Sequence, residues 1–194
     1  MASAFSHAIA ALAIGKISRV VKWPANLQKV DMKFWLIAAF CAVVPDLDAI
    51  GFWLGVPYDS LWGHRGITHS LFFAALLSVT MVYFFYKTEK PFSKGWLLLF
   101  MVFFVAGASH GILDAMTDRG KGVAFFAPFY DGRYFFPFRP IRTSPISITR
   151  FFTSHGWEVI KNEFVWIWIP SFIVMAVAAL IKRISKSSQI ARKG

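Results

Sequence analysis

Cysteine is almost absent from this chain of 194 residues, and acidic side chains are few. The single cysteine, Cys41, cannot form an intrachain disulfide, and its position inside an apolar run is typical of a small hydrophobic side chain. The charged segment that opens a cleaved signal peptide is missing as well, because Lys16 and Arg19 follow the first apolar stretch instead of preceding it. These absences argue against a disulfide framework and against a cleaved leader.

The shortage of acidic residues gives a formal net charge of +11 at pH 7, which in a soluble protein would suggest a nucleic-acid partner. Here the basic residues lie between and after apolar runs, as they do in the cytoplasmic loops of membrane proteins. Hydrophobic residues make up 57% of the chain, compared with about 45–50% in a typical soluble domain. We therefore expect a membrane protein with no nucleic-acid partner.

Five apolar segments approach the ~20 residues that a membrane-spanning helix needs. They run roughly over residues 2–21, 34–56, 67–86, 96–116 and 164–181. The second is interrupted by Pro45, and Trp166 and Trp168 near the start of the fifth are typical of the membrane interface. We predict an all-α fold, a polytopic membrane helical bundle of about five apolar helices that forms a single integral membrane domain over residues 1–194.

Basic residues cluster after the first, third and fifth apolar segments, so alternating segments would bring the three clusters to one side of the membrane. The positive-inside rule assigns this side to the cytoplasm, with the N-terminus outside and the basic tail, residues 182–194, inside. The loop over residues 55–66 and the long stretch over residues 117–163 then face outward. That stretch is rich in aromatic residues and prolines, and we expect it to form a structured cap at the interface of the inner (cytoplasmic) membrane.

Residues of the types that bind metal ions gather at the outward ends of the apolar segments. They are His7, Asp46, Asp48, His64, His69, His110 and Asp114. At ~1.5 Å per helical residue, representatives on four of the segments lie roughly 20–27 Å from the nearest basic cluster. In a hydrocarbon core ~30 Å thick, we expect these side chains at one depth, just beneath the outer headgroups.

Ionisable groups inside a membrane are costly and usually face a protein interior or a watery cavity. Asp46 and Asp48 are so close in sequence that their charges would repel each other unless a cation lies nearby. His110 and Asp114 are four residues apart, so on a helix they share a face and could bind one ion together. Imidazole and carboxylate ligands together suit zinc or manganese, and we expect one ion with a second layer of residues, or two ions.

Each of these residues also has an ordinary explanation. A single histidine at the end of a membrane helix is usually an interfacial polar residue, Asp48 could cap a helix, and two carboxylates beside a proline could form a turn. His64 and His69 would need a turn between them to meet at one ion. The placement of all these residues on one side favours a metal site. Beside such a site, Arg65 and Arg139 become candidate ligands of a substrate anion, because guanidinium binds phosphate through two N–H groups.

Several motifs resemble the YdjM-like family of membrane-bound, metal-dependent hydrolases. They are PDLD, GHRGITHS, SHGILDAMTDRGKGVAFFAPF, FFPFRPIRTSPI and KNEFVWIWIP. The family is similar, at a distance, to zinc-dependent phospholipase C and zinc-dependent single-strand nucleases. The resemblance implies that His110 and Asp114 form a metal-binding His-x-x-x-Asp pair. It implies further ligands among His7, one of Asp46 and Asp48, and one of His64 and His69.

Residues and resemblance together predict a membrane-embedded hydrolase that cleaves a phosphoester or related bond of a lipid-like substrate at the outer leaflet. One or two divalent ions would lower the pKa of a water molecule and polarise the phosphoryl oxygen. Asp46 or Asp48 could act as the general base, while Arg65 and Arg139 would hold the substrate anion. A later His-x-x-x-Glu pair of the soluble enzymes has no match here, which leaves Glu163 as a tentative ligand. Membrane lipids are the expected partners.

Two other classes of function fit part of the pattern. A divalent-metal transporter, or a membrane metal-binding protein without catalysis, would also place histidines and carboxylates inside the membrane. A transport pathway should continue to the other face, and the cytoplasmic ends of these segments carry mainly lysine and arginine. A structural component of a larger membrane complex would tolerate the loss of His110.

Overall fold

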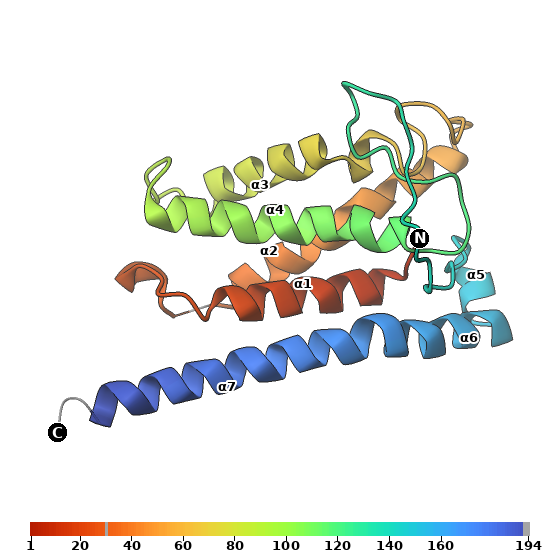
Figure 1. Cartoon of the computed structure of the whole chain (residues 1–194). Helices are drawn as coiled ribbons and strands as arrows, with labels where there is room; N and C mark the ends of the chain where they lie inside the picture. Colours follow the sequence, from red (N-terminus) through yellow and green to blue (C-terminus); the bar gives the residue numbers. More distant parts are fainter. Residues whose placement is uncertain (30, 192–194) are drawn as a thin grey trace.

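The computed structural model describes residues 1–29 and 31–191 and is a bundle of helices (Figure 1). The helices are α1 (Ala4–Ser18), η1 (Ala25–Leu27), α2 (Met32–Val43), η2 (Val44–Phe52), η3 (Ile67–His69), α3 (Leu71–Phe85), α4 (Lys94–Ala115), α5 (Ile148–Phe151), α6 (Ser154–Glu163), η4 (Phe164–Trp168) and α7 (Ile169–Ala191). Here η2 is a 3-10 helix and η4 a π-helix. Within the described residues β-structure is limited to two isolated bridges, so the all-α prediction is confirmed.

Polar residues set the starts of the main apolar helices. Asp31, Ser70 and Ser93 each accept a hydrogen bond from the backbone N–H three residues later, at 3.1, 3.0 and 3.2 Å. Such caps satisfy N–H groups that have no partner inside the helix. The starts of α2, α3 and α4 therefore follow from the local sequence.

In the described part of the chain, three helical stretches are long and apolar enough to cross a membrane: Met32–Phe52, Lys94–Ala115 and Ser154–Ser188. The apolar helices α1 and α3 are shorter, with 15 residues each. Each of the five predicted apolar segments therefore corresponds to a helix, although the boundaries differ.

The last helix begins earlier than predicted, at Ser154 instead of residue 164, and α6, η4 and α7 continue one another without a break. The ten residues of α6 were predicted to belong to the outward cap. They form a helix because α6 is amphipathic and buries Val159 and Glu163 against the bundle. A search for apolar runs does not detect such a helix.

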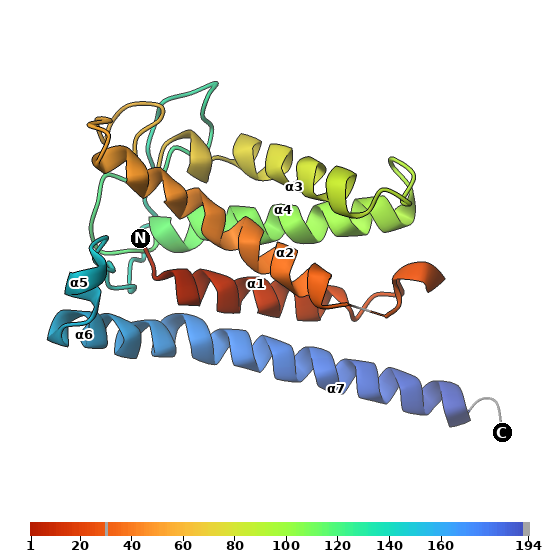
Figure 2. The ribbon, with the colours of Figure 1, turned by 180° about the vertical axis from the view of Figure 1, so that it is seen from behind.

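An apolar core between α1, α2 and α4 holds the bundle together. Phe34, Cys41 and Phe103 are buried in it, and the rings of Phe34 and Phe103 lie 5.9 Å apart. At Gly107 of α4 a Cβ would lie 3.2 Å from the Cβ of Ala74, so a small residue allows α3 to approach α4 closely. The long helix α7 lies along α1 on the outside of the bundle (Figure 2).

The connections between helices sort to the two ends of the bundle. Both views place the loop after η2, the segment between α4 and α5 and the N-terminus at one end, which we call the loop-bearing end. The links from α1 to α2 and from α3 to α4 lie at the other end with the last turns of α7. This arrangement agrees with alternating crossings, and the cytoplasmic orientation stays a prediction. The basic tail is helical as far as Ala191, and residues 192–194 of it lie outside the described part of the chain.

Backbone hydrogen bonds order the segment between α4 and α5. Val123 and Tyr134 exchange two such bonds at 2.9 and 3.0 Å, and Phe136 donates one to the Ala115 carbonyl at 3.0 Å. Ile141 accepts another from Asp118 at 2.9 Å and is fully buried. The segment is therefore an ordered cap over the loop-bearing end, and its place at the membrane interface stays a prediction.

Candidate metal centre

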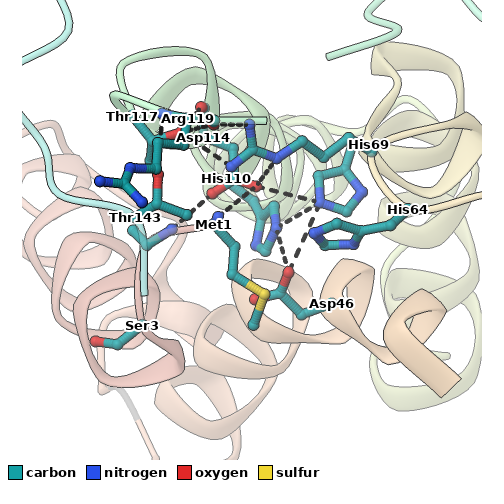
Figure 3. Close-up of polar contacts among 12 residues, drawn as sticks. Met1, Ser3, Asp46, His64, His69, His110, Asp114, Thr117, Arg119 and Thr143 are labelled. Atoms are coloured by element: carbon teal, nitrogen blue, oxygen red, sulfur yellow. Dashed lines mark hydrogen bonds and ion pairs between the residues drawn. The ribbon is translucent and has the colours of Figure 1, made fainter. Parts of the chain in front are cut away.

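The metal-binding residue types singled out from the sequence meet at the loop-bearing end. Figure 3 shows Asp46, His64, His69, His110 and Asp114 of this group. η2 contributes Asp46 and Asp48, the loop after η2 contributes His64, η3 contributes His69, α4 contributes His110 and Asp114, and α1 contributes His7. Two overlapping sets of four have ligand atoms that all lie within 4.8 Å of one another. The first set is Asp46, His69, His110 and Asp114, and the second is Asp46, Asp48, His64 and His69.

Pro45 shapes the approach of η2 to α4. The chain passes from α to 3-10 geometry at Val44, because proline has no N–H and its ring clashes with the carbonyl four residues earlier. In a 3-10 helix the N–H of residue 45 would donate a hydrogen bond to the Ala42 carbonyl. Proline has no N–H, so this bond is missing and the carbonyl can accept another donor. That carbonyl accepts a hydrogen bond from Nδ1 of His110 at 2.7 Å. Since Nδ1 carries the hydrogen, Nε2 of His110 presents a lone pair to the centre.

The first set surrounds a single point. Nε2 of His110 lies 3.0 Å from Nε2 of His69 and 3.3 Å from Oδ1 of Asp46. Nε2 of His69 lies 3.6 Å from Oδ2 of Asp114 and 3.7 Å from Oδ1 of Asp46. η3 can lie this close to α4 because residue 111 is a glycine. A Cβ at Gly111 would lie only 2.9 Å from the His69 carbonyl oxygen. Two imidazole nitrogens and two carboxylates therefore converge, as they would around one transition-metal ion.

The donor atoms of this set fit a cation, because protein groups leave them unpartnered. Both oxygens of Asp46 and Oδ2 of Asp114 are buried and accept no hydrogen bond from the described residues. Asp46, Asp48 and Asp114 carry three negative charges. Arg65 Nε and the N-terminal amine of Met1 both face Asp114, at 3.0 and 4.0 Å, whereas Asp46 and Asp48 have only histidines as ion-pair neighbours among the described residues. Unpaired buried carboxylates are costly, so the two remaining charges call for a cation. One divalent ion would neutralise them.

Asp48 is fully engaged by protein groups. Its Oδ1 lies 2.6 Å from Nδ1 of His64, and its Oδ2 accepts hydrogen bonds from Thr68 Oγ1 at 2.6 Å and from the Arg65 backbone N–H at 3.2 Å. Nδ1 of His69 lies 3.1 Å from the same Oδ2. A carboxylate placed behind two histidines fixes their ring orientation, as is common around bound metals.

Burial lowers the pKa of His64 even though the neighbouring Asp48 carboxylate acts in the opposite direction. The imidazole is therefore neutral near pH 7 and donates from Nδ1 to Asp48. Its Nε2 is left with a lone pair, and the ring lines a cavity of about 830 Å³.

Arg65 is 1% exposed and has a backbone φ of 63°, a left-handed conformation that is uncommon for residues other than glycine. Its guanidinium donates to Thr117 Oγ1 at 2.9 Å and to the Arg119 carbonyl at 3.1 Å. Its Nε lies 3.0 Å from Oδ2 of Asp114. Arg65 therefore connects the cap segment to the centre.

His7 lies directly beside the centre but belongs to neither set of four. Its ring stacks on that of His110 with centroids 3.8 Å apart, and its Nε2 lies 3.6 Å from Oδ1 of Asp114. Neither ring nitrogen has a hydrogen-bond partner among the described residues. His7 therefore stacks on the predicted ligand His110 and faces the predicted ligand Asp114.

Two further predicted residues lie apart from the two sets. Arg139 is exposed, and its guanidinium sits over the ring of Phe135 at 4.8 Å. Glu163 is buried, and its oxygens accept hydrogen bonds from the Ser3 backbone N–H at 2.6 Å, from the Ser3 hydroxyl and from the Ser6 hydroxyl at 2.7 Å. Glu163 therefore ties the last helix to the start of α1, one turn before His7.

Replacing Glu163 by alanine is expected to destabilise the protein without removing a bound metal. The change leaves buried Ser3 and Ser6 donors unsatisfied, at a cost of about 1–3 kcal/mol. Thermal unfolding in detergent should show a Tm lower by roughly 5 °C. Glu158→Ala is the matched control, because Glu158 is an exposed carboxylate on the same helix. An unchanged Tm, or loss of metal, would contradict this role.

A cavity of about 830 Å³ adjoins the centre. Its wall includes Asp46, His64 and Arg65 of the centre, the apolar side chains Leu47 and Ile50 of η2 and Trp53 directly after it, and Thr143, Ser144 and Arg150 of the cap side. Asp46 is thus both a member of the cluster and part of the cavity wall. A bound molecule could reach the centre from this side.

Sequence reasoning missed three residues that hold the centre in place. Thr68 donates to Asp48, Thr117 accepts from Arg65, and Arg133 donates to the His64 carbonyl at 3.0 Å. Thr68 lies inside the GHRGITHS motif, where its position between two metal-binding residue types was the available signal. Thr117 and Arg133 carry no comparable signal, because their contacts depend on how the cap folds back.

Comparison with known proteins gives two matches. Residues 1–186 match the family model described as YdjM inner membrane protein. The chain is also 35% identical over 136 residues to the inner membrane protein YbcI of Escherichia coli K12, an alignment that covers 70% of this chain and 77% of that protein. No solved structure matches significantly. Because the family model spans nearly the whole chain, this protein belongs to the YdjM inner membrane protein family.

Proposed function

We propose that this protein is a membrane-embedded, metal-dependent hydrolase that cleaves a phosphoester or related bond of a lipid-like substrate at the outer leaflet. One observation carries the proposal: a buried His/Asp cluster with two uncompensated negative charges opens into a cavity with an apolar wall. Lipid phosphoesters combine an anionic group that a metal centre attracts with a chain that an apolar wall accommodates. The cap over residues 116–153 would then face the outer leaflet.

Asp46, His69, His110 and Asp114 are the proposed ligands. Two nitrogen and two carboxylate donors suit zinc or manganese. The charge balance favours one divalent ion. A second ion would have to bind to the other set, Asp46, Asp48, His64 and His69. The cation would supply a Lewis acid that polarises a phosphoryl oxygen and lowers the pKa of a nearby water molecule.

The residues around the cation would transfer the proton and hold the ligands in position. Asp46 lines the cavity with both oxygens free of hydrogen bonds, so one oxygen could accept the proton of an attacking water. The water oxygen bonds to phosphorus, the bond from phosphorus to the lipid oxygen breaks, and that oxygen takes a proton. Asp48 would hold His64 and His69 in position. Arg65, whose guanidinium is already occupied by protein partners, would hold Asp114 in position and not the substrate.

A transport function finds less support. On the other side of the cluster the bundle interior is packed with buried apolar residues such as Ala38, Phe103 and Ala106. An ion pathway through a membrane protein is normally lined by polar groups. The histidine and aspartate ligands gather at the loop-bearing end, as a membrane-facing enzyme site requires.

Phosphate release is the test of this function. Wild-type protein loaded with Zn²⁺ or Mn²⁺ is expected to release phosphate from vesicles that contain phosphatidic acid or a polyprenyl phosphate. A chelator should lower the rate by at least about 100-fold, because metal catalysis contributes several kcal/mol. Re-adding the metal should restore it.

The His110→Ala variant is the matched control for contaminating phosphatases, because it removes one ligand at the end of α4. Equal rates from wild type and variant, or no release from any lipid by metal-loaded protein, would contradict the proposed activity. Metal binding with no phosphate release would favour a binding or transport protein.

A further inference from the structure

A second pocket, of about 530 Å³, lies next to the cavity of the metal centre. The two share the wall residues Thr143, Ser144, Pro145 and Arg150, and the second is completed by Asp118, Arg119, Arg142 and His155. Arg65 bridges the same region, because it donates to the Arg119 carbonyl and faces Asp114 of the centre. A molecule in the large cavity could therefore extend into this pocket, which we call the arginine pocket.

Two guanidinium groups of the arginine pocket have no ion-pair partner among the described residues, and the carboxylate in the pocket lining, Asp118, accepts hydrogen bonds from Thr143. Arg142 is paired with Glu158 at 3.4 Å. Within residues 1–29 and 31–191, no carboxylate oxygen lies within 4.0 Å of the guanidinium nitrogens of Arg119 or Arg150. The backbone of Arg119 is fixed, since its N–H donates to Thr143 Oγ1 at 3.1 Å. Arginines without a carboxylate partner are suited to phosphate, which accepts two parallel N–H bonds from guanidinium.

Another part of the wall of the large cavity is apolar and comes from η2 and the residue that follows it. A 3-10 helix has three residues per turn, so Leu47 and Ile50 of η2 and Trp53, directly after its last residue, form one stripe. These side chains are 58%, 47% and 81% exposed, which marks a surface that contacts lipid or a lipid-like ligand. The stripe starts next to Asp46 of the metal centre.

We infer that the protein binds an amphiphile with two anionic groups, one at the metal centre and a second in the arginine pocket, with its apolar chain along the Leu47–Ile50–Trp53 stripe. The inference deepens the proposed function, on which it rests, by naming the substrate class as a lipid diphosphate or a similarly dianionic lipid. Arg119 and Arg150 are the residues that select the second anionic group. The apolar stripe selects a lipid over a free phosphate compound.

Binding measurements with matched ligands test the inference. Metal-loaded protein in detergent is titrated calorimetrically with dioleoylglycerol diphosphate, dioleoyl phosphatidic acid and inorganic diphosphate. Wild type should bind the lipid diphosphate roughly tenfold more tightly than phosphatidic acid, as expected for one additional charge-assisted contact. Arg119→Gln/Arg150→Gln should remove that difference, while its affinity for phosphatidic acid should change less than about threefold.

Lys121→Gln is the matched control, because Lys121 is an exposed cation of the same segment that lines neither pocket. The inference is wrong if the double variant keeps the preference for the diphosphate, or if inorganic diphosphate binds as tightly as the lipid. Its failure is distinguishable from failure of the proposed function. Phosphate release that persists with an unchanged preference in the double variant would overturn only the arginine pocket, whereas the predicted binding pattern without phosphate release would overturn only the hydrolase.

Discussion

Replacing Asp46 by alanine is expected to lower the affinity of the centre for Zn²⁺ or Mn²⁺ by at least about 100-fold, more than the loss of a supporting residue would. Both Asp46 oxygens are buried beside His69 and His110 and accept no hydrogen bond from the described residues. The change removes a ligand and one of the two uncompensated charges. Competition with a coloured chelator measures the affinity, and elemental analysis of the purified protein measures the retained metal.

Two controls separate the loss of a ligand from a general disturbance. Asp46→Asn keeps the volume of the side chain and removes only its charge, so it should also weaken binding. Asp131→Ala removes an exposed carboxylate of the cap and should bind metal as wild type does. An Asp46→Ala protein with wild-type affinity would show that the ion, if any, lies elsewhere.

Replacing Arg65 by methionine is expected to cause the largest loss of stability of any single change in the centre. The side chain is buried, and its removal takes away the nearer of the two cationic neighbours of Asp114, leaving the Met1 amine at 4.0 Å, and leaves Thr117 without its donor. Removing one member of a buried ion pair typically costs about 3–5 kcal/mol. Thermal unfolding of the metal-free protein should show a Tm lower by roughly 10 °C.

The same variant distinguishes a positioning role for Arg65 from direct contact with substrate. Added Zn²⁺ should recover much of the lost stability, because the cation also neutralises Asp114. Arg139→Met, at an exposed arginine, should change the stability by less than about 0.5 kcal/mol. A Tm unchanged by Arg65→Met would mean that the guanidinium is free to serve the substrate instead.

The apolar helices and the gathering of polar residues at one end could be predicted from the sequence, because both follow from local patterns. Hydropathy identifies helices such as α3 and α4, and the spacing of His110 and Asp114 places them on one face. Alternation of the segments then brings the outward ends together. Helix α6 could not be predicted in this way, because its one buried face makes it amphipathic instead of apolar.

The separate roles of Asp46 and Asp48 depend on geometry that the sequence does not display. In the 3-10 helix after Pro45, residues two apart point in different directions, so Asp46 meets His110 while Asp48 meets His64. The sequence predicted only two neighbouring charges that need a cation. Likewise, the position of Glu163 beside Ser3 depends on how α6 packs against α1.

Zinc-edge X-ray absorption of the wild-type protein loaded with one equivalent of Zn²⁺ tests the central claim most directly. The account predicts nitrogen and oxygen ligands only, with multiple scattering from two imidazole rings, those of His69 and His110. The His110→Ala protein should retain the scattering of one ring. A spectrum without imidazole scattering, or one that His110→Ala leaves unchanged, would contradict a metal centre at this end of the bundle.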